Sequence, residues 1–161
     1  MTDPGTTLQA KVLTVSDGVV AGTRDDTGGR GLVEHLRVNG FEVVAHEVIA
    51  DGVDEVVDAL TRLCDGFAGL VVTTGGTGFG PRDQTPEGTR AVIERDAPGL
   101  AEAMRTVNPL GRLSRGIAGV RGRAIVCNTP GSPRGCIEQI DAIIDILPHA
   151  LRLLADAPTT H

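Results

Sequence analysis

The sequence contains neither tryptophan nor tyrosine, and only three phenylalanines. Proteins that hold single-stranded nucleic acid commonly stack its bases on aromatic rings, so the composition argues against that mode of binding. Basic residues are also a minority, because 15 lysines and arginines stand against 21 acids and the formal net charge is -6. This balance disfavours broad contact with a phosphate backbone, and we expect no nucleic-acid partner.

Cysteine is equally scarce, with Cys64, Cys127 and Cys136 as the full set. An odd number without a CxxC pair supports neither a disulfide framework nor a zinc site, and favours a reduced, cytoplasmic setting. The first seven residues are polar and lack the apolar segment of a secretion signal, and no run of 18 apolar residues occurs. We therefore expect neither secretion nor a membrane span.

Two familiar nucleotide-binding motifs are missing as well. A P-loop requires a lysine after its glycines, but the only lysine is Lys11, inside an apolar run. The dinucleotide motif GxGxxG is broken because Pro81 stands where its last glycine belongs. The four histidines share no spacing that predicts a metal site or a Ser-His-Asp arrangement.

Strand and helix patterns alternate along the 161 residues, which fit one domain with an aliphatic core. This alternation predicts βαβ units and a mostly parallel sheet covered on both faces. The expected strands are residues 11–16, 41–49, 68–74 and 123–128, and the expected helices are residues 31–40, 52–66, a segment from 85, 99–107 and 136–154, the last allowing a kink at Pro148.

Four polar or glycine-rich loops follow the four predicted strands. In parallel α/β sheets, ligands bind beyond the carboxyl ends of the strands, so these loops are expected to form one site. The loop at residues 75–78, Gly-Gly-Thr-Gly, offers consecutive main-chain N–H groups that an oxyanion can approach closely. The same glycines also suit a tight turn, and the residues alone leave both interpretations open.

Two carboxylates lie in neighbouring loops of this edge. Asp51 follows the second strand and Asp83 lies just after the glycine loop, so together they could hold Mg²⁺, which prefers oxygen ligands and is often shared with phosphates. Alternatively, Asp83 caps the helix that follows it and Asp51 closes a turn before Gly52.

A local reversal of charge lies further along the chain. Residues 105–134 contain six arginines and no acid, so this segment could concentrate an anionic small molecule. Ser114 and Asn128 add neutral hydrogen-bonding groups. Solvated loops or a contact between subunits would explain the same arginines. The arginines are Arg105, Arg112, Arg115, Arg121, Arg123 and Arg134.

Four motifs, in order and in register, resemble the MogA/MoaB family of molybdenum cofactor biosynthesis proteins, which is related to the gephyrin G domain. They are TTGGTGFGPRDQTPE, PGLAEAMR, LSRGIAGVRG and NTPGSP, within residues 12–154. The resemblance implies a three-layer αβα sandwich over residues 9–155, with flexible tails at 1–8 and 156–161. It also implies a homotrimer that uses Mg²⁺ and ATP to adenylylate molybdopterin, releasing pyrophosphate and supplying a MoeA-type metal insertase.

Carried over by motif, the family's functional aspartates and metal ligands are Asp51 and Asp83. The first loop departs from the family pattern D-x-S-G-P, but Thr27 keeps the hydroxyl group and is expected to contact the substrate. The remaining expected contacts to substrate or nucleotide are Gly75, Gly76, Thr77, Gly78, Ser114, Asn128, Pro130, Gly131 and Ser132.

Two other functions are compatible with the sequence. A MoaB-type protein would bind molybdopterin or its precursor without adenylyl transfer, although the presence of both Asp51 and Asp83 favours the enzyme. An oligomeric scaffold would use the arginine segment as its interface and bind no nucleotide.

Overall fold

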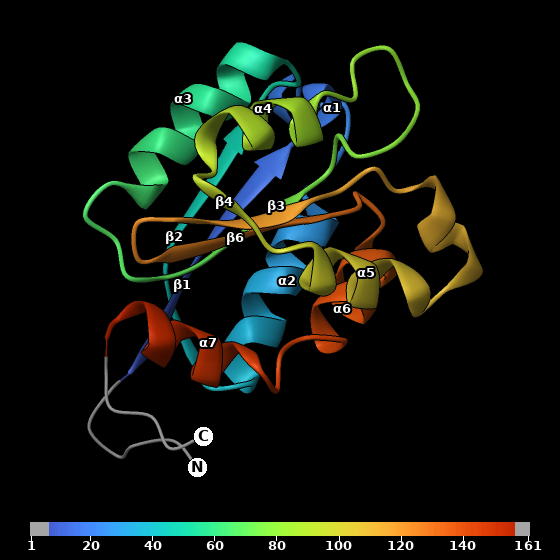
Figure 1. Cartoon of the computed structure of the whole chain (residues 1–161). Coiled ribbons are helices and arrows are strands. Elements are labelled where there is room, and N and C mark those ends of the chain that lie inside the picture. Colours follow the sequence, from blue (N-terminus) through green and yellow to red (C-terminus); the bar gives the residue numbers. More distant parts are fainter. Residues whose placement is uncertain (1–6, 157–161) are drawn as a thin grey trace.

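The computed structural model describes residues 7–156, which form one six-stranded sheet between two layers of helices (Figure 1). The strand order is β2-β1-β3-β6-β5-β4, with the first four strands parallel and the last two antiparallel to their neighbours. The expected three-layer αβα fold with a mostly parallel sheet is therefore confirmed. The strands are β1 (Leu8–Val15), β2 (Phe41–Ile49), β3 (Gly69–Thr74), β4 (Arg95–Asp96), β5 (Ala118–Arg121) and β6 (Ala124–Thr129).

Helices α3 and α4 cover one face of the sheet, and α2, α5, α6 and α7 cover the other (Figure 1). In the described part of the chain, no helix is long and apolar enough to cross a membrane. The helices are α1 (Asp17–Val20), α2 (Thr27–Val38), α3 (Val53–Cys64), α4 (Thr85–Val92), α5 (Pro98–Thr106), the 3₁₀ helix η1 (Pro109–Leu113), α6 (Pro133–Asp141) and α7 (Leu147–Leu154).

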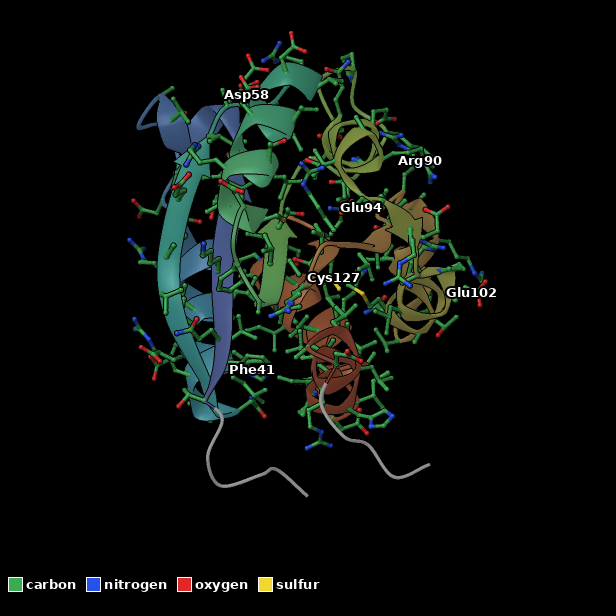
Figure 2. The ribbon with its side chains drawn as sticks, turned by 60° about the vertical axis from the view of Figure 1, so that its left-hand side comes forward. Phe41, Asp58, Arg90, Glu94, Glu102 and Cys127 are labelled. Carbon is green, nitrogen blue, oxygen red and sulfur yellow. The ribbon has the colours of Figure 1, made fainter. Side chains whose placement is uncertain are left out.

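The central strands are buried on both faces, so their side chains alternate between two separate cores. Ala10, Leu70 and Ile125 lie side by side on β1, β3 and β6 and pack against α2 and the C-terminal helices. Val71 and Val126, one position further along, pack against α3 and α4. Figure 2 shows Cys127 of β6 inside the molecule, where burial raises the pKa of its thiol to about 12.

Proline determines where the last helices begin. The predicted helix over 136–154 is wrong as a single element, because α6 ends at Asp141 and α7 starts anew at Leu147. Pro148 lies in the first turn of α7, where its missing N–H group is not needed, so the chain breaks before the proline and does not kink at it. Pro133 likewise lies in the first turn of α6, as its first residue.

Two strands were not predicted, and two element boundaries differ from the sequence expectation. The short strands β4 and β5 were not predicted; β5 forms a hairpin with β6 through Gly122, whose φ is +57°. Helix α2 begins four residues earlier than predicted, at Thr27, because Asp26 caps it. Leu8, placed in the N-terminal tail, pairs with Phe41 in the sheet; the tails at 1–6 and 157–161 lie outside the described residues.

Candidate active site

A cavity of about 690 Å³ opens beyond the carboxyl ends of β1, β3 and β6. It is the place where a doubly covered parallel sheet binds ligands, and it collects most of the residues predicted from the sequence. The predicted residues that line it are Asp51, Gly75, Gly76, Thr77, Gly78, Asp83, Ser114, Pro130, Gly131 and Ser132. Thr27 and Asn128 are not among its lining residues.

The glycine loop leaves β3 through two residues with left-handed backbone conformations. Gly75 has φ +101° and Gly76 has φ +68°. A Cβ atom on Gly75 would lie 2.2 Å from the carbonyl oxygen of Val15, so only glycine fits. Within residues 7–156, the main-chain N–H groups of Gly76, Thr77 and Gly78 have no hydrogen-bond acceptor. Free donors on a cavity wall suit an anionic ligand better than a simple turn.

Asp51 is buried against this loop. Its Oδ2 accepts a hydrogen bond of 2.9 Å from the N–H of Asp17, and its Oδ1 would be 3.0 Å from a Cβ atom on Gly76. Loss of hydration raises the pKa of the Asp51 carboxyl, and the negative charges of Asp17 and Asp83 raise it further, against the N–H of Asp17 and the charge of Arg82. A carboxylate in this position attracts a cation.

Asp83 does not cap the helix that follows it. The residue before α4 is Gln84, and among the described residues no side chain caps that helix. The Oδ2 atom of Asp83 instead accepts a hydrogen bond of 2.9 Å from the N–H of Gly80, and it would lie 3.0 Å from a Cβ atom on Gly78. The two aspartates thus contact the same glycine loop.

Asp17 and Arg82 contact Asp51, and neither was predicted as a site residue. Arg82 Nε donates to Asp17 Oδ2 over 2.6 Å, and Arg82 Nη2 donates to the carbonyl oxygen of Asp51 over 2.9 Å. The guanidinium group beside Asp17 holds the pKa of that carboxyl below its usual value. A sequence signal existed, because Ser16-Asp17-Gly18 after β1 parallels Ala50-Asp51-Gly52 after the adjacent strand β2.

Arg115 holds the glycine loop in place. Its main-chain N–H donates to Thr77 O over 2.8 Å, and its guanidinium donates to Gly78 O over 2.9 Å and to Asp83 O over 2.6 Å. The remaining nitrogen pairs with Glu87, whose pKa Arg115 lowers. A planar guanidinium group can satisfy these divergent acceptors together.

The arginine segment therefore does not act as the expected anion collector. Of its six members only Arg134 lines the cavity. Arg105 and Arg121 donate to the main-chain carbonyl groups of Gly116 and Val92. Three of the six arginines, Arg105, Arg115 and Arg121, thus bind main-chain carbonyl groups and do not line the cavity.

We expect Arg115→Met to lower the catalytic efficiency about 10–100-fold, because small displacements of aligned groups have large kinetic effects. Amide hydrogen exchange of Gly80 and Asp83, whose N–H groups are hydrogen-bonded within this loop, should accelerate, since two contacts of the guanidinium group to main-chain carbonyl groups are lost. Arg37→Met, which removes the same charge from the exposed end of α2, is the matched control. Wild-type exchange and activity in the Arg115 variant would show that the loop needs no such support.

The first loop is organised by Asp26 and not by Thr27. Asp26 Oδ1 accepts a hydrogen bond of 2.9 Å from the N–H of Gly29, and its carboxylate also contacts Thr14 Oγ1 and His46 Nε2, both at 2.9 Å. Thr27 is exposed at the start of α2, outside the cavity lining, which Gly28 and Gly29 reach instead. The expected contact of Thr27 is not supported by this placement.

Asn128 lies behind the cavity as a structural residue. It is buried, its Nδ2 donates to Thr73 Oγ1 and Thr89 Oγ1 over 3.0 and 2.9 Å, and its Oδ1 accepts from the N–H of Ile117 over 3.1 Å. With its side-chain groups engaged, Asn128 joins β3, α4 and the start of β5. Ser132, by contrast, lines the cavity and caps α6 by accepting from the N–H of Gly135.

Residues 11–149 match the family described as "Probable molybdopterin binding domain". The chain belongs to the MogA/MoaB family. The molybdopterin adenylyltransferase of Helicobacter pylori is 35% identical over 156 residues, covering 92% of this chain and 88% of that protein. That of Escherichia coli K12 is 34% identical over 147 residues, covering 86% and 75%. The solved structure of the molybdopterin biosynthesis enzyme MoaB from Thermus thermophilus has a TM-score of 0.87 and 43% identity, covering 95% of this chain and 99% of the other.

The donor set of this MogA/MoaB cavity fits a magnesium ion shared with a substrate. No cluster of three or more His, Cys, Asp or Glu residues suited to a metal occurs among the described residues. Asp51 and Asp83 would supply two carboxylates, and phosphate oxygens would supply further ligands, which is how Mg²⁺ is usually held beside nucleotides. Burial, together with the charges of Asp17 and Asp83, raises the pKa of Asp51, so a bound cation would stabilise its charged form.

In Mg²⁺-free buffer, Asp51→Asn is expected to increase the free energy of unfolding at neutral pH. The pKa of Asp51 is raised in the folded chain. Between the pKa of the unfolded chain and this raised pKa, the folded chain therefore binds more protons, and the free energy of unfolding falls as the pH rises through that interval. Asparagine keeps the acceptor for the N–H of Asp17 and removes the destabilising charge. Thermal unfolding at several pH values tests this; a gain that persists below the usual pKa of aspartate would contradict the explanation.

Proposed function

We propose that this MogA/MoaB-family protein adenylylates molybdopterin with Mg²⁺-ATP, giving adenylyl-molybdopterin and pyrophosphate. The observation that carries the proposal is the shared cavity in which Asp51 and Asp83 flank a loop with free main-chain N–H groups. The adenylyltransferase names of the relatives from Helicobacter pylori and Escherichia coli support the same reaction.

In this reaction an oxygen of the molybdopterin phosphate forms a bond to the α-phosphorus of ATP, and the bond between the α-phosphorus and the bridging oxygen of pyrophosphate breaks. The nucleophile is already ionised at neutral pH, so the site needs no general base. Within residues 7–156, no histidine lines the cavity, which agrees with that requirement. Catalysis then consists of aligning two anions and compensating their charge.

The chain's own groups have separate roles in this alignment. The N–H groups of Gly76, Thr77 and Gly78 would bind phosphate oxygens, and the N-terminus of α6, beginning at Pro133, adds a favourable dipole beside Gly131. Magnesium, when bound, supplies positive charge that stabilises the pentacovalent phosphorus and the departing pyrophosphate. Asp51 and Asp83 would position that charge next to the glycine loop.

Pyrophosphate release that requires both molybdopterin and Mg²⁺, together with mass analysis of the adenylylated product, tests the proposal directly. The alternative, binding of molybdopterin without adenylyl transfer, draws support from the 43% identity to a protein named MoaB. The same assay separates the two, because a binding protein would retain molybdopterin and release no pyrophosphate.

We also propose that the protein works in the cytoplasm as a homotrimer and passes its product to a MoeA-type metal insertase. The family supports these assignments. Analytical ultracentrifugation of the purified chain would measure the number of subunits, and transfer of the product to an added MoeA-type protein would test the partner.

A further inference from the structure

Gln139 of α6 is a buried polar residue without a partner. Its exposed fraction is 5%, and its side-chain amide makes no hydrogen bond to any residue of 7–156. Among those residues, no side-chain nitrogen or oxygen is both fully enclosed and unsatisfied. The Gln139 amide must therefore open to the cavity that it lines. A buried amide without a hydrogen-bond partner destabilises the fold unless water or a ligand forms hydrogen bonds with it.

The surroundings of Gln139 suit a flat heterocycle. Glu138, the preceding residue on α6, lines the same cavity, and its Oε2 accepts a hydrogen bond of 3.1 Å from Asn108. Leu110 and Leu113 of η1 also line it, and both are strongly exposed for leucine, at 72% and 53%. Apolar side chains to cover ring faces and a few polar groups to meet a ring edge are the usual composition of such a pocket.

Resting on the proposed function, we infer that Gln139 is a specificity-determining residue that binds the pyrimidine edge of the pterin. A pterin presents an amino group, a ring N–H and a carbonyl oxygen in a row. The Gln139 amide can accept from the ring N–H and donate to the carbonyl, while Glu138 accepts from the amino group. Adenine could also pair with the Gln139 amide, through its N6 amino group and a ring nitrogen, so selectivity for the pterin depends on the row of three groups, in which Glu138 accepts from the amino group next to the ring N–H.

Gln139→Met tests this assignment, because methionine has a similar volume and no strong donor or acceptor. We expect the Kd of molybdopterin, measured by calorimetry, and its KM to rise about tenfold, the effect of one or two lost hydrogen bonds. The Kd of ATP, kcat and the melting temperature should stay unchanged. Gln9→Met, at the opposite end of β1, is the control for the same replacement.

The outcomes separate this inference from the proposed function. A wild-type protein that turns over, with a Gln139→Met variant that keeps wild-type affinity for molybdopterin, would overturn the role of Gln139 alone. Weakened binding of ATP but not of molybdopterin would assign Gln139 to the adenine base and also overturn the inference. Equal weakening of both ligands with a lower melting temperature would show a merely structural role. A wild-type protein that binds no molybdopterin would overturn both proposals.

Discussion

Asp83→Asn is expected to lower molybdopterin-dependent adenylyl transfer by about 100–1,000-fold, as does the loss of a single preorganised charge-stabilising group elsewhere. The variant should fold normally, because within residues 7–156 the Asp83 side chain makes a single hydrogen bond, from the N–H of Gly80. Asparagine Oδ1 can still accept the hydrogen bond from the N–H of Gly80. What disappears is a negative charge beside the glycine loop, and with it a ligand for Mg²⁺.

Pyrophosphate release at several Mg²⁺ concentrations measures this effect, and circular dichroism with thermal melting checks the fold. If Asp83 acts through the metal, excess Mg²⁺ should restore part of the activity. Asp58→Asn removes the same charge from an exposed surface of α3, visible at the outside of the molecule in Figure 2, and should leave turnover unchanged. A folded Asp83 variant with full activity would refute the proposed role.

The parts of the site that could be predicted are those encoded by neighbours in sequence. The glycine loop follows directly after β3, Asp83 lies in the same connection, and Asp51 lies just after β2. Parallel strands bring their carboxyl ends, and so these residues, to one edge of the sheet. The fold class followed from the same alternation of apolar runs. Local sequence patterns were enough to predict these loops, because the common direction of the parallel strands, and not any individual contact, brings them together.

What escaped prediction depends on partners far away in the chain. The guanidinium group of Arg115 contacts residues 28 to 37 positions earlier, and nothing in the local sequence distinguishes this arginine from one exposed to solvent. Asn128 was expected to contact ligand because its NTPGSP motif resembles that of the family, yet its side chain donates to Thr73 and Thr89. The strand β5 was hidden because its Ala-Gly-Val-Arg sequence has little strand propensity and relies on pairing with β6.

The second large effect is expected at Gly75, where the chain turns out of β3. Its φ of +101° disfavours any L side chain, and an added Cβ atom would lie 2.2 Å from the carbonyl oxygen of Val15. That oxygen belongs to the backbone of a buried strand and cannot rotate away. The N–H of Gly75 also donates to Thr129 O, and its carbonyl oxygen accepts from Thr85 Oγ1. Displacement of Gly75 would therefore disturb the contacts on both sides of the loop.

Gly75→Ala should therefore lower the free energy of unfolding by about 3 kcal/mol or more, the range reached when strain and a steric clash combine. In a chain of this length, that corresponds to a fall in melting temperature of roughly 6–12 °C. Gly22→Ala is the matched control, because Gly22 also has a positive φ, +76°, but nothing lies within 4 Å of its added Cβ atom. It should lose only about 1–2 kcal/mol from the left-handed backbone. Equal losses at both positions would show that backbone strain alone is responsible, and that the close approach of Gly75 to Val15 contributes nothing to the glycine loop.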